Sequence, residues 1–311
     1  MPPLVVQTEH LPEVCQQWLA ERVDLHACPA DSLRFKELLP DIAGVVVRTY
    51  TTVDKRMLEE AGKLRVVGRA GVGLDNIDLP ACRNHGVRVV HTPEANAEAV
   101  VEFVLSAVLP RIRPLEQLHE SIELPQWKLL RDNALTQREF SETTLGILGF
   151  GRIGSRLGAT AAAMGFRVIY NDLRQIEAPA GCEQVDLDDL LEQSHVLSIH
   201  VDGRADNRHF LSSEHFSRLS EDMVLVNSAR GFVLDAEPLS HFLRGHPDAC
   251  AILDVHEEEP FGDGYPLLGL PNARLYPHIA ARTERALLNM GWVVRDVAAI
   301  LAGDAPAFEK L

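Results

Sequence analysis

The chain has 311 residues, of which 46% are hydrophobic and 24% are charged, a composition typical of a folded globular protein and long enough for two domains. Lys and Arg number 30 against 45 Asp and Glu, so the net charge of −15 opposes binding to nucleic acid and to anionic membrane surfaces. The amino terminus does not resemble a secretory signal, and we expect no membrane span and a cytoplasmic protein. The five cysteines lack metal-ligand spacing, so we expect no metal site.

Short apolar runs alternate with segments of helix length along the whole chain. Such runs, too short for helices and apolar on both faces, are typical of strands buried in a parallel sheet. The sequence therefore predicts an α/β fold with parallel sheets. The predicted strands are residues 4–6, 44–47, 64–68, 87–90, 145–149, 167–170, 196–199, 223–226 and 251–253.

Two long apolar segments of helical character divide these strands into two sets. One runs from Glu94 to about Leu118, and the other from about Thr283 to Leu301, after the last predicted strand. We expect them to connect two domains. The first domain is discontinuous, 1–95 plus 281–311, and the second, 96–280, is inserted into it.

A glycine-rich turn follows the strand predicted at 145–149. Gly149, Gly151 and Gly154 have the G-x-G-x-x-G spacing between a strand and a helix that binds a pyrophosphate in Rossmann domains. The next predicted strand ends at Asp172, an acid placed to accept hydrogen bonds from the adenosine ribose and to repel a 2′-phosphate. The pattern predicts NAD rather than NADP. A generic strand-to-helix turn is the alternative interpretation.

Three later segments and one earlier segment complete a family resemblance. They are Val226–Gly231, Ile252–Pro260, Tyr276–Ala281 and, before the glycine turn, Gly68–Asp78. Together with the glycine turn they resemble the D-isomer-specific 2-hydroxyacid dehydrogenase family over nearly the whole chain. The resemblance implies an NAD-dependent oxidoreductase with two Rossmann-like or flavodoxin-like domains, in which an NAD domain, 96–280, is inserted into a substrate domain.

Within the family the nearest resemblance is to the D-3-phosphoglycerate dehydrogenases of serine biosynthesis, carried by Gly68–Asp78 and His91–Asn96. The chain ends at Leu311, so we expect a short form without a regulatory domain. The resemblance also implies a homodimer, with the segment Ala95 to Leu109 as its contact.

The resemblance also implies a catalytic set. Removal of hydride from C2 of an alcohol requires loss of the hydroxyl proton, for which histidine is suited, and His278 occupies the family position. Glu259 matches the carboxylate that holds the imidazole, with Glu257 and Glu258 as weaker candidates. Arg230 matches the planar donor to the substrate. Taken alone, His278 would more often be a core histidine, since the chain has 13 histidines, and only the accompanying motifs favour the catalytic interpretation.

The remaining cofactor contacts follow from the same resemblance. Asp254 is expected to accept a hydrogen bond from the nicotinamide carboxamide, although a turn-forming acid at a strand end is the alternative. The other predicted cofactor-binding residues are Arg152, Ile153, Val201 and Ala229.

The substrate is expected to bind to the first domain. Backbone amides of the Ala70–Gly73 loop, including those of Val72 and Gly73, are expected to hold the substrate carboxylate. Arg48 and Arg69 flank this loop and could bind a distal phosphate. Equally, either arginine could pair with Asp75 or Asp78.

Two departures from the family pattern bear on function. Asp202 replaces the usual proline after the predicted strand at 196–199, which predicts a looser loop and weaker NAD binding. The segment 279–283 differs from that of the phosphoglycerate enzymes. The substrate could therefore be glyoxylate, hydroxypyruvate, or a branched or aromatic 2-oxo acid. A further alternative is an NAD(H)-sensing protein like the transcriptional corepressors of this fold.

Overall fold

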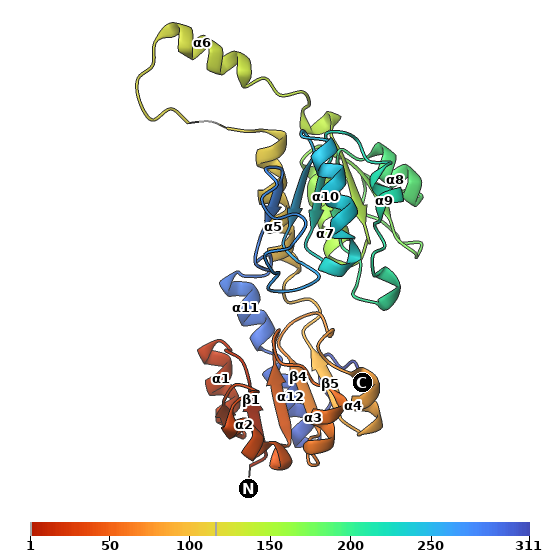
Figure 1. Cartoon of the computed structure of the whole chain (residues 1–311). Helices are drawn as coiled ribbons and strands as arrows, with labels where there is room; N and C mark the ends of the chain where they lie inside the picture. Colours follow the sequence, from red (N-terminus) through yellow and green to blue (C-terminus); the bar gives the residue numbers. More distant parts are fainter. Residues whose placement is uncertain (1, 116) are drawn as a thin grey trace. The chain divides into compact units, whose positions relative to one another are not determined.

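The structure, a computed structural model, describes residues 2–115 and 117–311 and divides them into two compact units (Figure 1). Unit 1 comprises the residues up to Asn96 together with Ala281–Leu311, and unit 2 is Ala97–Ala280. Each unit is built on one parallel sheet covered by helices, so the predicted α/β class is confirmed.

The sheet of unit 1 has five parallel strands in the order β2-β1-β3-β4-β5. Four of them match predicted strands, whereas β2 was not predicted, because it is an edge strand with a partly exposed, mixed sequence, DLHA. The strands are β1 (Leu4–Gln7), β2 (Asp24–Ala27), β3 (Gly44–Val47), β4 (Val66–Arg69) and β5 (Arg88–His91).

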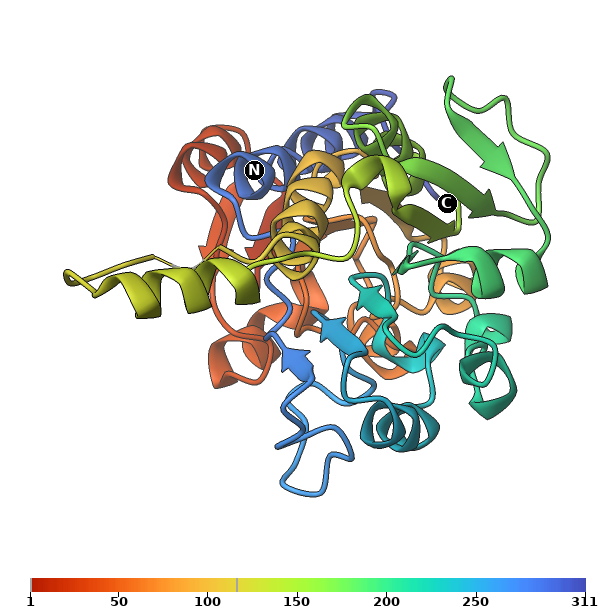
Figure 2. The same ribbon diagram turned by 90° about the horizontal axis from the view of Figure 1, so that it is seen from above.

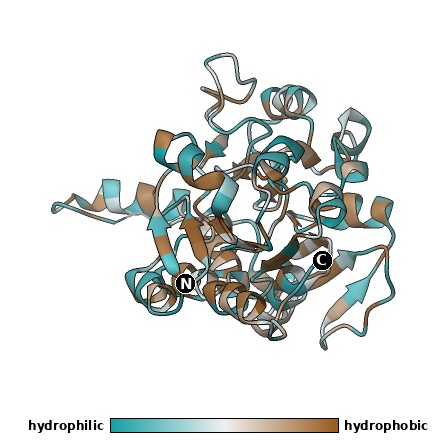
Figure 3. Cartoon of the chain, turned by 90° about the horizontal axis from the view of Figure 1, so that it is seen from below, coloured by the Kyte–Doolittle hydropathy of each residue, from teal (hydrophilic) through white to brown (hydrophobic). Residues whose placement is uncertain are grey.

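Alternate residues of these strands enter two separate hydrophobic cores. Val6, Val45 and Val67 pack with the side chains of α2 (Leu33–Leu38), η1 (Leu39–Asp41), α3 (Lys55–Glu60) and α4 (Leu79–Asn84). Val5, Val46 and Val66 pack with α1 (Glu13–Ala20) and α12 (Val294–Ala302). Because successive side chains of a strand point to opposite faces, the runs of valine contribute to the hydrophobic cores on both faces of the sheet. Figure 3 shows hydrophobic residues in brown along several strands.

The sheet of unit 2 has seven parallel strands in the order β12-β11-β10-β9-β6-β7-β8. The two edge strands, β8 and β12, were not predicted, because both are short and partly exposed. The strands are β6 (Thr144–Leu148), β7 (Arg167–Asn171), β8 (Cys182–Gln184), β9 (Val196–Ile199), β10 (Val224–Asn227), β11 (Cys250–Leu253) and β12 (Ala273–Leu275). The order reverses at β6, which lies between β7 and β9, and ligands bind at such a switch point, outside the carboxyl ends of the strands.

Helices enclose this sheet. Leucines and phenylalanines of α8 (Leu187–Gln193), α9 (Ser213–Phe216) and α10 (Ala236–Gly245) form one core with the strands. Helix α5 (Ala97–Ile112) contacts β10 and α7, and α7 (Arg152–Ala163) contacts β6 and β7. Short 3-10 turns complete the unit at η2 (Phe140–Glu142), η3 (Ala205–Asn207) and η4 (Gly231–Val233).

Both long helices predicted from the sequence are shorter than expected. The first ends at Ile112, because Pro114 disfavours helical backbone in the residue before it. A separate helix, α6 (Leu124–Asn133), follows and has no buried residue, and Figures 1 and 2 show it apart from the sheet of its unit. Residue 116, within the predicted helix, lies outside the described residues.

The second predicted helix is two helices. Thr283 caps α11 (Glu284–Gly291) by accepting a hydrogen bond from the Ala286 backbone N–H, and α12 begins at Val294. Gly291, a poor helix former, is the last residue of α11. No described helix is both long and apolar enough to cross a membrane.

Replacement of Gly68 tests the packing of unit 1. A Cβ at this position would lie 2.3 Å from Cγ2 of Val297 on α12, a side chain that is completely buried. We expect Gly68→Ala to lower the free energy of unfolding by about 1–3 kcal/mol through overpacking. Gly62→Ala, where no atom lies within 4 Å, is the control. Equal chemical denaturation midpoints for the two variants would contradict this packing.

Candidate active site

The glycine turn joins β6 to α7 at the carboxyl edge of the unit 2 sheet. Gly149 has a positive φ of 91°, and a Cβ there would lie 2.7 Å from the carbonyl carbon of His200. A Cβ at Gly154 would lie 2.2 Å from the Gly149 carbonyl oxygen. Gly151, by contrast, faces open space. The start of α7, where Arg152 and Ile153 follow Gly151, therefore has room beside it for a phosphate, as a bound dinucleotide requires.

Asp172 is fixed beside this turn at the end of β7. Its Oδ2 accepts a hydrogen bond from the Phe150 N–H at 2.9 Å, and its Oδ1 accepts one from the Arg174 N–H at 3.0 Å. Burial raises the pKa of this carboxyl group, but the two backbone donors and the Arg174 guanidinium outweigh burial, so the pKa is lowered. A charged carboxylate thus lies at the position predicted for the adenosine ribose.

The loop after β9 contacts the turn from the other side. Val201 lies next to Gly149, and Asp202 accepts two hydrogen bonds of 2.7 Å from Arg204 and one of 3.0 Å from Asn207. The aspartate that replaces the family's proline therefore ties this loop together. His200 contacts the Ser198 hydroxyl at 2.8 Å, and burial lowers its pKa to about 4, so the imidazole stays neutral.

Asn227, which the sequence analysis did not identify, shapes the loop that carries Arg230. This completely buried residue ends β10, accepts the Ala229 N–H at 3.0 Å and donates to the Arg230 carbonyl at 2.9 Å. The Arg230 guanidinium donates to the Ala229 carbonyl at 2.6 Å. The sequence signal for this loop-shaping residue was limited to its place at the end of a predicted strand, at the start of Asn227–Gly231.

Glu259 and His278 are in contact. Nδ1 of His278 lies 2.8 Å from Oε2 of Glu259, and Oε1 of Glu259 accepts the His256 N–H at 2.9 Å. Burial raises the pKa of Glu259, but the hydrogen bonds from His278 and His256 outweigh it, so the pKa is lowered. With 44% of the His278 side chain exposed, the ring presents Nε2 on the side away from Glu259. Glu257 instead binds Arg208 and His209.

Asp254 holds the loop that bears His278. The Asp254 carboxylate accepts hydrogen bonds from the backbone N–H of Ile279 at 2.7 Å and of Ala280 at 2.8 Å. The Asp254 backbone carbonyl accepts the N–H of His278 at 2.9 Å. Burial raises the pKa of Asp254, and the two amides offset part of the rise. Whatever contact it makes with a cofactor, Asp254 is a structural anchor for this loop.

The predicted substrate residues lie in unit 1, at the carboxyl ends of β3 and β4. Loop 70–73, which contains Val72 and Gly73, is tied to the end of β5. Thr92 donates to the Gly71 carbonyl through its N–H at 3.1 Å and its hydroxyl at 3.2 Å, and His91 Nδ1 lies 2.9 Å from the Val72 carbonyl oxygen. The loop backbone therefore has a defined shape.

Arg48 and Arg69 border loop 70–73. Arg69 lies across Gly71 and donates to the Ala70 carbonyl at 3.4 Å. Arg48 donates to the His10 carbonyl at 3.0 Å, and burial, followed by the positive charge of Arg282, lowers its pKa. Asp78 caps α4 instead of pairing with Arg48.

Glu9, another residue that the sequence analysis missed, holds the backbone of residues 48–51. Its two carboxylate oxygens accept the N–H groups of Arg48, Thr49, Tyr50 and Thr51 at 2.9–3.2 Å. Burial raises its pKa, but these four donors outweigh burial and lower it. No sequence motif signals this contact, which spans about 40 residues of chain.

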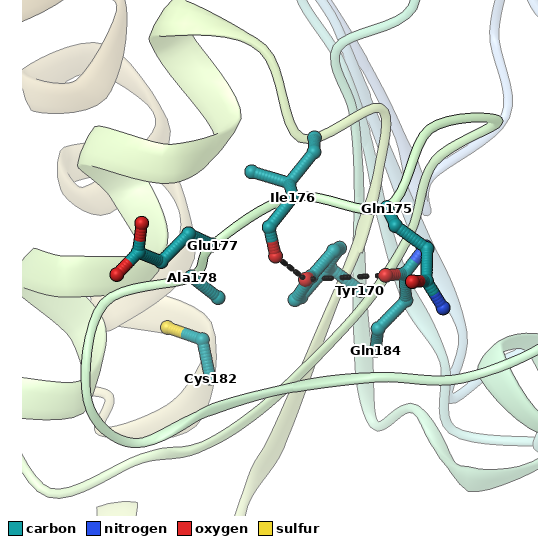
Figure 4. Close-up of a pocket in the computed structure, with 7 residues that line it drawn as sticks. All are labelled: Tyr170, Gln175, Ile176, Glu177, Ala178, Cys182 and Gln184. Atoms are coloured by element: carbon teal, nitrogen blue, oxygen red, sulfur yellow. Dashed lines mark hydrogen bonds between the residues drawn. The ribbon is translucent and has the colours of Figure 1, made fainter.

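A separate pocket of about 540 Å³ lies beside β7 and β8, lined by Tyr170, Gln175, Ile176, Glu177, Ala178, Cys182 and Gln184 (Figure 4). The Tyr170 hydroxyl donates a hydrogen bond to the Ile176 carbonyl at 3.2 Å, so two of the lining residues are joined to each other. None of the predicted catalytic residues lines it. No cluster of metal-binding side chains occurs among the residues that the structure describes.

The edge of the unit 2 sheet thus combines a glycine turn of dinucleotide-binding type with a histidine held by a carboxylate. A histidine held in this way is suited to the proton transfer that accompanies hydride transfer at a carbonyl carbon. Such a combination defines an NAD-dependent oxidoreductase. The family model described as "D-isomer specific 2-hydroxyacid dehydrogenase, NAD binding domain" matches residues 105–280. The chain belongs to this family.

Relatives of two named activities resemble the chain. A hydroxypyruvate reductase of Thermotoga maritima is 34% identical over 82% of this chain and 83% of its own length. A D-3-phosphoglycerate dehydrogenase of Archaeoglobus fulgidus is 31% identical over 83% of this chain but only 49% of its own length. The chain thus spans about half of this second relative.

The solved structure of the TT0316 protein from Thermus thermophilus has a TM-score of 0.84 and 29% identity. The match covers 99% of this chain and 100% of the other. The predicted family and the predicted fold are both confirmed.

Proposed function

We propose that this chain interconverts a D-2-hydroxy acid and the corresponding 2-oxo acid with NAD as the hydride carrier. The observation that carries the proposal is the 2.8 Å contact between His278 Nδ1 and Glu259, on the same sheet edge as the glycine turn. Bound NAD accepts or supplies the hydride at C2, and the protein has to manage the accompanying proton.

His278 is proposed to carry that proton on Nε2, opposite Glu259. The carboxylate fixes the Nδ1–H tautomer, so that Nε2 can take the proton from the C2 hydroxyl during oxidation and return it during reduction. Arg230 is proposed to bind the C2 oxygen and the substrate carboxylate, and the amides of Val72 and Gly73 to bind that carboxylate.

D-3-phosphoglycerate is the substrate proposed first. Arg48 lies close enough to Arg282 and to Glu9 for its charge to interact with both, and the Glu9 carboxylate binds the backbone N–H groups of residues 48–51. Two guanidinium groups near one another in a strongly acidic chain suit a phosphate on C3. The resemblance to phosphoglycerate dehydrogenases supports the same substrate.

Reduction of hydroxypyruvate or glyoxylate is the second candidate. The Thermotoga maritima reductase aligns over 83% of its own length with this chain. In addition, the guanidinium groups of Arg48 and Arg69 already donate to backbone carbonyls, which favours a structural function for both arginines.

We also propose a homodimer, with a contact that includes the arm formed by residues 113–115 and 117–139. Valines 100, 101, 104 and 108 of α5 are buried, so α5 alone offers little apolar surface. The arm instead exposes large side chains: Leu115, Leu118, Leu124, Trp127, Leu129 and Leu135. A surface of this kind in a monomer marks an interface.

Replacement of His278 tests the chemistry. His278→Gln is expected to lower kcat by about 10²–10⁴-fold while NADH affinity changes less than about threefold, because only the proton carrier is lost. NADH fluorescence titration and steady-state kinetics measure the two effects, and His241→Gln, at an exposed position on α10, is the control. Near-normal turnover by the His278 variant would refute this assignment.

A substrate panel combined with Arg48→Gln tests the proposed acid. We expect oxidation of D-3-phosphoglycerate, with a KM about 10–100-fold higher in the variant because a charge-assisted contact is lost, and little change for hydroxypyruvate. The loop should persist, because Glu9 binds the backbone of residue 48. Arg34→Gln on α2 is the control. Activity with hydroxypyruvate or glyoxylate alone would favour the second candidate. Inactivity with every acid would favour the NAD(H)-sensing alternative.

Light scattering tests the dimer. Trp127→Glu combined with Leu124→Glu should convert the dimer to a monomer at micromolar concentration, since both side chains are exposed on α6 and would place charges in the contact. Leu33→Glu, at a more exposed position on α2, should leave the mass unchanged. A monomeric wild-type chain, or a dimer unaffected by the α6 substitutions, would disprove the contact.

A further inference from the structure

His256 contacts Glu259 and the segment that leads to His278, the two members of the proposed catalytic pair. It follows β11, two residues after Asp254 and three before Glu259, and only 6% of it is exposed. Its backbone N–H donates to Oε1 of Glu259 at 2.9 Å, while Oε2 of the same carboxylate contacts His278. Glu259 is therefore held at both oxygens, by one residue on each side.

The imidazole of His256 reaches the segment that bears His278. Its Nε2 lies 2.9 Å from the carbonyl oxygen of Tyr276, two residues before His278. A carbonyl oxygen can only accept, so Nε2 carries a proton. Nδ1, 3.1 Å from the Tyr265 hydroxyl, then accepts from that hydroxyl in the neutral ring. One side chain thus joins the Glu259 loop to the chain that leads to His278.

Aromatic packing restricts the ring further. The rings of Phe261 and Tyr265 lie edge-on to the imidazole, with ring centroids 4.7 Å and 5.4 Å from its centroid. These two rings also stack on each other, with their centroids 4.7 Å apart. The loop of Arg230 also contacts His256, because a Cβ at Gly231 would lie 1.9 Å from the carbonyl carbon of His256. His256 is therefore in contact with the segments that carry Arg230, Glu259 and His278.

We infer that His256 is a positioning residue, which holds the carboxylate of Glu259 and the imidazole of His278 at hydrogen-bond distance through its contact with Tyr276. This inference rests on the proposed function of that pair. His256 does not carry the transferred proton, because both ring nitrogens are bonded within the protein. Misplacement of catalytic groups by about 1 Å can lower a rate by about 10²-fold.

Two substitutions separate positioning from packing. His256→Phe keeps a ring against Phe261 and Tyr265 but removes the donor to Tyr276, whereas His256→Gln keeps an N–H donor at a similar distance from the backbone. The matched control is His246→Phe. The Nδ1 of His246 also lies 2.8 Å from a carbonyl oxygen, that of Phe242, and its ring centroid lies 4.5 Å from that of Phe242, but His246 is the C-cap residue of α10 and contacts neither Glu259 nor His278 in these hydrogen bonds.

The first readout needs no substrate. In ¹⁵N-histidine spectra of the whole chain, the Nδ1–H of His278, assigned from its loss in His278→Gln, reports the contact with Glu259. We expect this signal to broaden or shift in His256→Phe, to return in His256→Gln and to remain unchanged in His246→Phe. An unaltered signal in His256→Phe would overturn the inference.

The second readout is kinetic, measured with whichever acid the wild-type chain turns over. We expect His256→Phe to lower kcat by about 10–100-fold and to increase the solvent deuterium isotope effect, with the KM for NADH within about twofold. His256→Gln should recover most of kcat. Loss of kcat together with NADH affinity, at an unchanged isotope effect, would show a merely structural residue. If His278→Gln keeps its activity, the proposed function fails instead.

Discussion

The buried carboxylate of Asp254 determines the geometry of the candidate active site. It accepts two backbone N–H groups from the residues after His278, and the Asp254 carbonyl accepts that of His278 itself. His278 has a φ of 56°, a left-handed conformation that costs a residue with a Cβ about 1–2 kcal/mol. Three hydrogen bonds offset this cost, so the sharp turn that presents the imidazole to Glu259 persists.

The parallel sheet explains how residues distant in sequence reach one another. Strands β6, β7, β9, β10 and β11 all point the same way, so the residues that follow them gather at one edge. The turn at Gly149, the acid Asp172 and the loops of Arg230 and Asp254 each follow a different strand. The helices and strands supply a rigid base, and the chemistry lies in the loops, as in other doubly wound domains.

The sequence predicted most of this arrangement, because buried parallel strands and glycine turns have local signals. Edge strands β2, β8 and β12 escaped prediction because half-exposed strands lack continuous apolar runs. Asp202 suggested a loose loop, but Arg204, only two residues away, binds its carboxylate. Tertiary contacts without any sequence signal, such as that of His256 with Tyr276, became visible only in the structure.

Glu9 has a consequence for which side chains residues 48–51 of this chain can carry. Its carboxylate fixes residues 48–51 entirely through their backbone N–H groups, so the path of this loop does not depend on which side chains it carries. Tyr50, 85% exposed, can therefore be exchanged without loss of the loop. A loop whose path is fixed through its backbone tolerates changes of side chain, so its surface can be altered by single substitutions.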